Sequence, residues 1–378
     1  MLTIADQIAQ ELQVTAKQIS AAISLLDEGA TVPFIARYRK EVTNGLDDNH
    51  LRHLEQRLGY LRELAERRKV ILTNIEQQGK LTAELAQKIN DADNKTRLED
   101  LYLPYKPKRR TKGQIAIEAG LAPLAEKLFN DWHTNPEQAA REFINAGSDF
   151  KDTESVLEGA TAILIEQFAE DATLLEKLRR HLLKHAHITS QVVKAKQEDA
   201  GKYRDYFDHS EKYSNVPSHR ALAMFRGRNE GFLRVTLNPE VSNNAEPCQD
   251  IIMRHFNLAL SSQAAAKYLT ATVTTAWKQK LSKHLYTELL GQLKDKAELE
   301  AIAVFASNLK DLLLTAPAGS KVTLGIDPGY RTGCKLAIVD QTGKLLHTAT
   351  IFPHEPQNNW DKSVRTIVNL CRQHKVEL

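Results

Sequence analysis

The chain has 378 residues, a length that suits about two or three domains. Hydrophobic residues make up 42% of it, which argues against general disorder. Its 51 Lys and Arg against 48 Asp and Glu leave a formal net charge of +3, which excludes a chain-wide polycation and confines any nucleic-acid surface to a local patch. The 17 glycines and 12 prolines are few, which favours long helices over a turn-rich all-β fold.

We expect neither a signal peptide nor a membrane span. Its N-terminus lacks the basic and apolar regions of a signal peptide, and no stretch approaches ~18 uncharged apolar residues. The three cysteines, Cys248, Cys334 and Cys371, lie far apart and have no CxxC or zinc spacing. We therefore expect a cytoplasmic, mainly α protein with reduced thiols and no membrane contact.

The N-terminus predicts a pair of short helices. Apolar residues recur at helical spacing from Ile4, and Thr15 with Gln18 forms a capping box that begins a second helix. The pair resembles a helix-turn-helix. The second helix carries only Lys17, however, where a DNA reader needs Arg, Asn or Gln facing the bases. A structural helix pair is favoured, and a DNA reader is the alternative.

A long helix follows. Asp47 or Asp48 can cap its start, and the apolar spacing continues to about Gln78, with Gly79 behind it. Near thirty residues at ~1.5 Å each would span about 45 Å, enough to brace separate modules. A scaffold helix is favoured over a dimerising coiled coil.

The whole chain divides into three predicted regions. We expect a helical region over 1–200, in which Ala172–Lys196 is the last helical run, and a further helical region with one strand at Phe232–Leu237 over 201–318. A truncated α/β domain is expected over 319–378. The fold class is thus mainly α followed by a partial α/β domain.

The C-terminal region changes to the period of strands after a linker at 316–320. Three hairpin-linked strands are expected at 322–327, 333–339 and 345–352, with a helix over about 358–374. The last residues resemble the start of a fourth strand. We therefore expect the sheet to be incomplete and the chain to be truncated.

Asp327 is a weak catalytic candidate at the end of the first of these strands, directly before Pro328 and Gly329. A carboxylate there can hold a divalent cation, as in two-metal nucleases, but that chemistry needs several converging carboxylates. Asp340 lies at the far end of the hairpin. A structural aspartate is therefore favoured, and a metal ligand is the alternative.

A basic segment, residues 106–112, contains five cations and no acid. Pro104 and Pro107 disfavour helix and predict an extended conformation over residues 102–112. Tyr105 can stack on bases while the cations neutralise phosphates. The alternative is a solvated loop paired with neighbouring acids such as Glu99 and Asp100. The predicted phosphate-binding side chains are Lys106, Lys108, Arg109, Arg110 and Lys112.

Two further basic clusters are candidates for phosphate contact. Arg226 and Arg228 flank a glycine and predict a phosphate-binding turn after a helix that follows Pro217. The alternative is an arginine pair that bridges to Glu230. The other cluster lies beside Tyr38 and consists of Arg37, Arg39 and Lys40.

The remaining motifs predict no metal and no cofactor. His181 and His185 share a helix face near His187, but Leu182 stands where zincin chemistry needs a glutamate. The sequence contains no evident Ser-His-Asp set, P-loop or GxGxxG fingerprint.

Four long stretches resemble the bacterial Tex family of transcription accessory proteins. They occur in the family's order and comprise Thr31–Asp48, Leu98–Leu121, Val216–Gly231 and Gly325–Asp340. The resemblance implies a helical N-terminal Tex region and a YqgF-type RNase H-like domain from near Val322. Helix-hairpin-helix elements and an oligonucleotide-binding barrel, the main RNA contact, would lie beyond Leu378.

The resemblance also bears on chemistry. Asp327 matches the first acidic position of RNase H-like nucleases. The carboxylates that would complete such a site would follow Leu378. The resemblance further implies little nuclease function, because the YqgF domain of Tex-like proteins is generally viewed as lacking it. We expect a non-enzymatic, transcription-associated protein that binds RNA or DNA, with the transcription machinery or the ribosome as candidate protein partners. The alternatives are a metal-dependent nuclease or resolvase using Asp327, an actin-like ATPase, and a pure scaffold.

Overall fold

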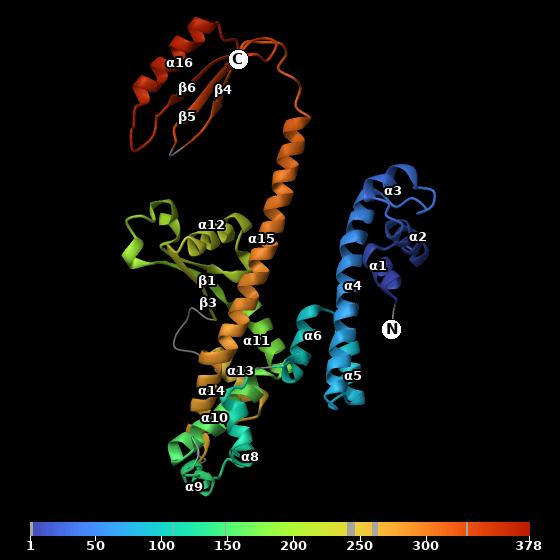
Figure 1. Ribbon diagram of the computed structural model, residues 1–378, viewed down its shortest axis with the longest axis vertical. Coiled ribbons are helices and arrows are strands. Elements are labelled where there is room, and N and C mark those ends of the chain that lie inside the picture. The colour runs from blue at the N-terminus through green and yellow to red at the C-terminus, as the bar shows by residue number, and fades with distance from the viewer. Residues whose placement is uncertain (1–2, 108, 148, 240–245, 259–263, 330–331) are drawn as a thin grey trace. The chain divides into compact units, whose positions relative to one another are not determined.

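The computed structural model describes residues 3–107, 109–147, 149–239, 246–258, 264–329 and 332–378. Contacts divide the chain into two compact units, Met1–Leu299 and Glu300–Leu378 (Figure 1). Helices dominate, as predicted, and each unit contains one three-stranded sheet. Among the described residues, no helix combines the length and apolar character needed to cross a bilayer.

The first helices pack along one long helix and share a hydrophobic core with it. The long helix has 30 residues and buries Leu51, Leu54, Ile71 and Ile75 completely. The elements are α1 (Ile4–Leu12), α2 (Ala16–Asp27), α3 (Val32–Tyr38), α4 (Asp48–Gln77), α5 (Ala83–Asn90) and α6 (Lys95–Tyr102).

The predicted caps set the ends of these helices. Thr15 and Gln18 form the capping box of α2, and the Asp47 carboxylate accepts the His50 amide at 2.8 Å to begin α4. Gly79 follows α4 in the left-handed region with φ +67°. The long helix therefore has the bounds that the sequence predicts.

Ion pairs attach the first two helices to α4. Arg57 pairs with Glu11 of α1 at 2.7 Å, and Arg62 pairs with Asp27 of α2 at 2.7 Å. These contacts hold α1 and α2 against α4, as expected of a structural helix pair. Its alternative role as a DNA reader stays a prediction.

A second core lies among the helices from α7 to α15. Phe168 is fully buried there and stacks on Phe256 with ring centroids 4.6 Å apart. The helices are α7 (Lys112–Glu118), α8 (Ala122–Asn130), α9 (Pro136–Ala140), α10 (Thr153–Ala169), α11 (Ala172–His185), α12 (Ser218–Asn229), α13 (Pro247–His255), α14 (Ala266–Ala276) and α15 (Ser282–Leu313), with a π-helical turn, η6 (Trp277–Leu281), before the last.

A small antiparallel sheet interrupts this helical series. Its strands are β1 (His187–Val192), β2 (Asp208–Lys212) and β3 (Leu233–Asn238), in the order β2-β1-β3. The prediction of helix over Ala172–Lys196 is wrong beyond His185, because Ile188 and Ser190 are buried at strand spacing between two partner strands. The predicted strand near Phe232–Leu237 is confirmed as β3.

A buried ion network joins the two helical cores. Arg179 of α11 contacts Asp100 of α6 at 3.0 Å and Glu288 of α15 at 2.6 Å. Only 3% of the Asp100 side chain and 12% of the Arg179 side chain are exposed. The network therefore fixes α6, and the chain that follows it, against α11.

After the last part of α15, residues 300–313, the second unit contains an antiparallel sheet covered on one face by a helix. Its elements are β4 (Thr323–Asp327), β5 (Cys334–Val339), β6 (Leu345–Ile351) and α16 (Trp360–His374), as predicted. Leu336, Ile338 and Leu370 form the core between sheet and helix. The Leu324 amide donates to the Leu378 carbonyl at 2.8 Å, so the last residues pair with β4.

Candidate nucleic-acid interface

The basic segment connects α6 to α7 and is anchored at both ends. The Gln78 side chain donates to the Tyr105 carbonyl at 2.8 Å, and Thr111 accepts the Gln114 amide at 3.1 Å to cap α7. The expectation of an extended chain is wrong before Lys106, because Leu103–Tyr105 continues α6 as a 3-10 turn, η1. Proline is compatible with the first turn of a helix, where its missing N–H has no partner to lose.

The cations of the basic segment have different surroundings. Lys106 and Arg109 are exposed, and within the described ranges no ion pair engages either of them. Arg110 pairs with Glu118 of α7, with 2.5 Å between Nη2 and Oε2. Tyr105 is half-buried against the N-terminal core, and Lys108 lies outside the described residues. Lys106 and Arg109 are thus the two side chains best placed to contact phosphate.

The acids named in the alternative interpretation of this segment are engaged elsewhere. Glu99 pairs with Arg67 of α4 at 2.5 Å, and Asp100 pairs with Arg179. Among the described residues of the segment, the one ion pair is with Glu118 instead, an acid that was not among the expected partners. Its signal was Thr111, because a cap at that position predicts a helix that brings Glu118 back toward Arg110.

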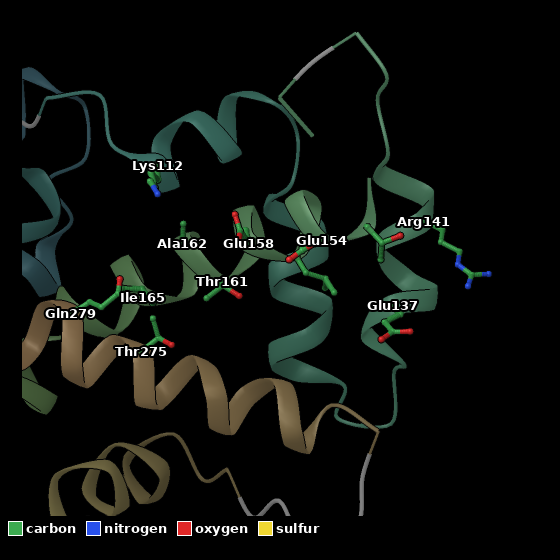
Figure 2. Close-up of a pocket in the computed structure, with 12 residues that line it drawn as sticks. Lys112, Glu137, Arg141, Glu154, Glu158, Thr161, Ala162, Ile165, Thr275 and Gln279 are labelled. Atoms are coloured by element: carbon green, nitrogen blue, oxygen red, sulfur yellow. The ribbon is translucent and has the colours of Figure 1, made fainter. Parts of the chain in front are cut away.

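A cavity of about 690 Å³ lies beside the last cation of the segment. Figure 2 shows Lys112, the first residue of α7, on one side of it and Thr275 with Gln279 on the other. Three carboxylates line the cavity against two cations, so its charge disfavours a phosphate. The five charged lining residues are Lys112, Glu137, Arg141, Glu154 and Glu158.

The second basic cluster lies within a helix. The prediction of a phosphate-binding turn at Arg226 and Arg228 is wrong, because α12 continues to Asn229. Gly227 serves packing: a Cβ there would lie 2.5 Å from Cδ1 of Leu233. Arg226 is exposed, and the Arg228 guanidinium lies 5.0 Å from the Phe225 ring centroid.

Glu230, the acid named in the alternative for this cluster, pairs with Lys202 at 2.6 Å. This pairing lowers the pKa of the Glu230 carboxyl. A phosphate contact by Arg226 or Arg228 stays a prediction.

The third basic cluster lies at the C-terminal end of α3 and is exposed. Arg37, Arg39 and Lys40 all face solvent, as do the rings of Phe34 and Tyr38 on α3. Tyr38 was expected beside this cluster, whereas Phe34 was not among the predicted site residues. Its signal was the spacing of four residues, which places both rings on one face of a helix.

Asp327 ends β4 on the exposed face of the second sheet, opposite Lys335 of β5. Asp340 does not approach it: its carboxylate accepts the amides of Thr342 at 2.8 Å and Lys344 at 3.0 Å in the β5–β6 turn. These hydrogen bonds, led by that of the Thr342 hydroxyl, lower the pKa of Asp340. In the part of the chain that the structure describes, no three His, Cys, Asp or Glu residues form a metal-binding group.

The histidines of α11 belong to no group of three metal-ligating side chains among the described residues. His181 and His185 stack with ring centroids 4.8 Å apart on α11, and His187 begins β1.

Comparison with known proteins finds three family models along the chain. Residues 2–76 match the Tex-like protein N-terminal domain, residues 131–305 the Tex central region-like model, and residues 321–378 the Tex protein YqgF-like domain. The transcriptional accessory protein Tex of Neisseria gonorrhoeae is 50% identical over 382 aligned residues, which cover 100% of this chain and 49% of that protein. The chain belongs to the Tex family.

Other relatives extend this Tex-family similarity. Protein YhgF of Escherichia coli (strain K12) is 56% identical over 98% of this chain and 48% of its own length. Human S1 RNA-binding domain-containing protein 1 is 30% identical over 88% of this chain and 34% of its own length. The Tex-family chain described here thus spans about half the length, or less, of these curated relatives.

Proposed function

We propose that this Tex-family chain is a nucleic-acid-contacting framework of a transcription accessory protein, and that it acts without catalysis. The observation that carries the proposal is the anchored basic segment, on which Lys106 and Arg109 are exposed and have no ion pair within the described residues. Phosphate contacts of this kind give affinity but no sequence information. The chain therefore binds RNA or DNA with strong salt dependence and weak sequence selectivity.

Two relatives support this class of ligand and this setting. One carries the name transcriptional accessory protein Tex, and another is named for an S1 RNA-binding domain. The transcription machinery or the ribosome is accordingly the setting in which we propose that the chain works. The cytoplasm is the proposed compartment, and the three free cysteines are compatible with its reducing conditions.

A non-catalytic role is supported by the surroundings of Asp327. Two-metal hydrolysis needs carboxylates that converge on the cations. Asp327 lies opposite Lys335 on the neighbouring strand. The Asp340 carboxylate accepts the backbone amides of Thr342 and Lys344 in a turn. Binding and positioning of nucleic acid are therefore proposed in place of cleavage.

Fluorescence anisotropy tests the proposal directly. The chain is titrated against labelled RNA, single-stranded DNA and duplex DNA, each in two unrelated sequences, at low and physiological salt. We expect binding that weakens steeply with salt and differs little between the two sequences. No binding at low salt, or binding that one sequence alone supports, would contradict the proposal.

A further inference from the structure

Two exposed aromatic rings lie side by side on α3. Phe34 and Tyr38 expose 42% and 63% of their surface, and their ring centroids are 5.4 Å apart with 47° between the planes. The opposite face of α3 is buried through Val32 and Ile35. Burial thus holds the helix in place while the two rings face solvent. We call Phe34 and Tyr38 the aromatic pair.

One cation lies against the aromatic pair, and two more are close to it in the chain. The Arg39 guanidinium carbon lies 5.8 Å from the Phe34 ring centroid, and Arg37 and Lys40 are exposed nearby in the chain. Within the described ranges, none of these three cations has an ion pair. Glu41 is the one acid among residues 31–46. The surface therefore combines flat apolar rings with an excess of positive charge.

The backbone beside the pair is fixed. The Gly45 amide donates to the Lys40 carbonyl at 2.9 Å, and Thr43, which is fully buried, donates its amide to the Arg39 carbonyl at 3.2 Å. The Gln18 side chain donates to the Asn44 carbonyl at 2.9 Å and so anchors this turn to α2. A rigid platform loses little conformational entropy when a ligand binds to it.

We propose that the aromatic pair stacks unpaired bases of single-stranded RNA or DNA, while Arg37, Arg39 and Lys40 contact the adjacent phosphates. Base–aromatic stacking next to a cationic track is the general chemistry of single-strand binding. A duplex cannot use this site in the same way, since its bases are already stacked on one another. Tyr, Phe and Arg are also enriched at protein interfaces, but the excess of positive charge beside the pair is complementary to a polyanion, so docking of a protein is treated as an outcome of the test.

The site deepens the proposed function, since it rests on the premise that the chain binds nucleic acid, but it uses other residues. The α3 helix lies beside the start of α4 (Figure 1), whereas Tyr105, next to the basic segment, contacts Gln78 just after the end of α4. A helix of 30 residues is about 45 Å long. Changes at one site therefore leave the geometry of the other intact.

The test measures the affinity of the 378-residue chain for a single-stranded oligonucleotide containing 2-aminopurine and for a duplex of the same sequence. We expect Tyr38→Leu and Phe34→Leu each to weaken single-strand binding about tenfold or more and to reduce the change in 2-aminopurine fluorescence. Tyr38→Phe keeps the ring and is expected to bind as the unmodified chain does. Trp360→Leu removes another exposed aromatic, on α16, and serves as the matched control.

Two outcomes would overturn the inference. One is unchanged single-strand affinity in both leucine variants, which would also be the result if the pair docked a protein. The other is an equal loss of duplex and single-strand binding. Thermal unfolding of each variant monitors the fold, which we expect to be unaffected because both rings are largely exposed. The two proposals can be separated. If neutral substitutions at Lys106 and Arg109 leave binding unchanged while Tyr38→Leu weakens it, the basic segment is not the interface, and base stacking by the aromatic pair is supported.

Discussion

Arg110, which precedes α7, and Glu118, the last residue of α7, form an ion pair with Nη2 and Oε2 2.5 Å apart. The pair lowers the pKa of the Glu118 carboxyl below its ordinary value of 4.5, chiefly through the hydrogen bond from Arg110, so both groups stay charged at neutral pH. A cation that is already paired with a carboxylate gains less from a phosphate than a free one does. The charge available to nucleic acid is therefore smaller than the composition of the segment indicates.

Glu118→Gln is expected to increase nucleic-acid affinity. The substitution releases the Arg110 guanidinium, and one more phosphate contact steepens the dependence of log affinity on log salt by about one. The measurement is an anisotropy titration over a series of salt concentrations. Glu28→Gln removes an exposed carboxylate on another part of the N-terminal bundle and is the control. An unchanged slope in Glu118→Gln would show that Arg110 does not reach a phosphate.

Arg179→Leu is expected to destabilise the first unit by about 3–5 kcal/mol, since it leaves Asp100 and Glu288 buried without their cation. Burial raises the pKa of Asp100 above its ordinary 3.8, and loss of Arg179 removes the main opposing influence. A raised carboxyl pKa means that the folded state holds the proton more tightly than the unfolded state. The loss of stability caused by Arg179→Leu should therefore become smaller as the pH falls through the pKa of Asp100 in the folded state.

Urea unfolding at neutral and mildly acidic pH measures this effect. The control is Arg62→Leu, whose ion pair with Asp27 is half-exposed and is expected to contribute about 0–1 kcal/mol. Equal stability of the two variants would contradict the role given to the buried network.

Gly159→Ala is expected to destabilise the second core by about 1–3 kcal/mol. A Cβ at this position of α10 would lie 2.5 Å from Cδ1 of Leu121 and 2.7 Å from Cε1 of Phe150. Gly59→Ala on α4 is the opposite case, because a Cβ there meets nothing within 4 Å. It should stabilise its helix by about 0.5–1 kcal/mol. Thermal unfolding distinguishes the two; a stabilised Gly159→Ala would show that α10 can move away from its neighbours.

Asp327→Asn is expected to leave nucleic-acid binding unchanged, and neither form of the chain should cleave RNA or DNA with Mg²⁺ or Mn²⁺ present. The reason is that a single carboxylate does not form a two-metal site. Denaturing gels of labelled single-stranded, duplex and branched substrates provide the measurement. Cleavage by the unmodified chain that is lost in Asp327→Asn would establish the nuclease alternative.

Local signals predicted much of the fold. The capping box at Thr15 and the cap at Asp47 are short-range hydrogen bonds, so their residues can be recognised without knowing the rest of the structure. Strands β4, β5 and β6 were also predictable, because hairpins join consecutive segments. The family resemblance, confirmed by the comparisons, covered the order of the regions along the chain.

Features that depend on distant partners escaped prediction. Strand β1 follows α11 after one residue, and its pairing with β2 and β3 involves segments well removed in sequence. Gly227 signalled a turn, yet it lies in α12 because Leu233 packs against it. Within the interface, the sequence supplied the cations and the Thr111 cap that brings Glu118 toward Arg110, but which face of α3 is exposed depends on the packing of Val32 and Ile35.

The salt dependence of binding by a Lys106→Gln, Arg109→Gln double variant tests the central claim most directly. Both side chains are exposed, so the fold should be unaffected. We predict weaker binding to RNA and DNA and a log–log salt slope reduced by roughly 1.4 to 1.8. A Lys362→Gln, Arg365→Gln variant on α16 makes the same change in charge at two other exposed positions and should match the unmodified chain. An unchanged slope and affinity in the Lys106, Arg109 variant would contradict the proposed interface.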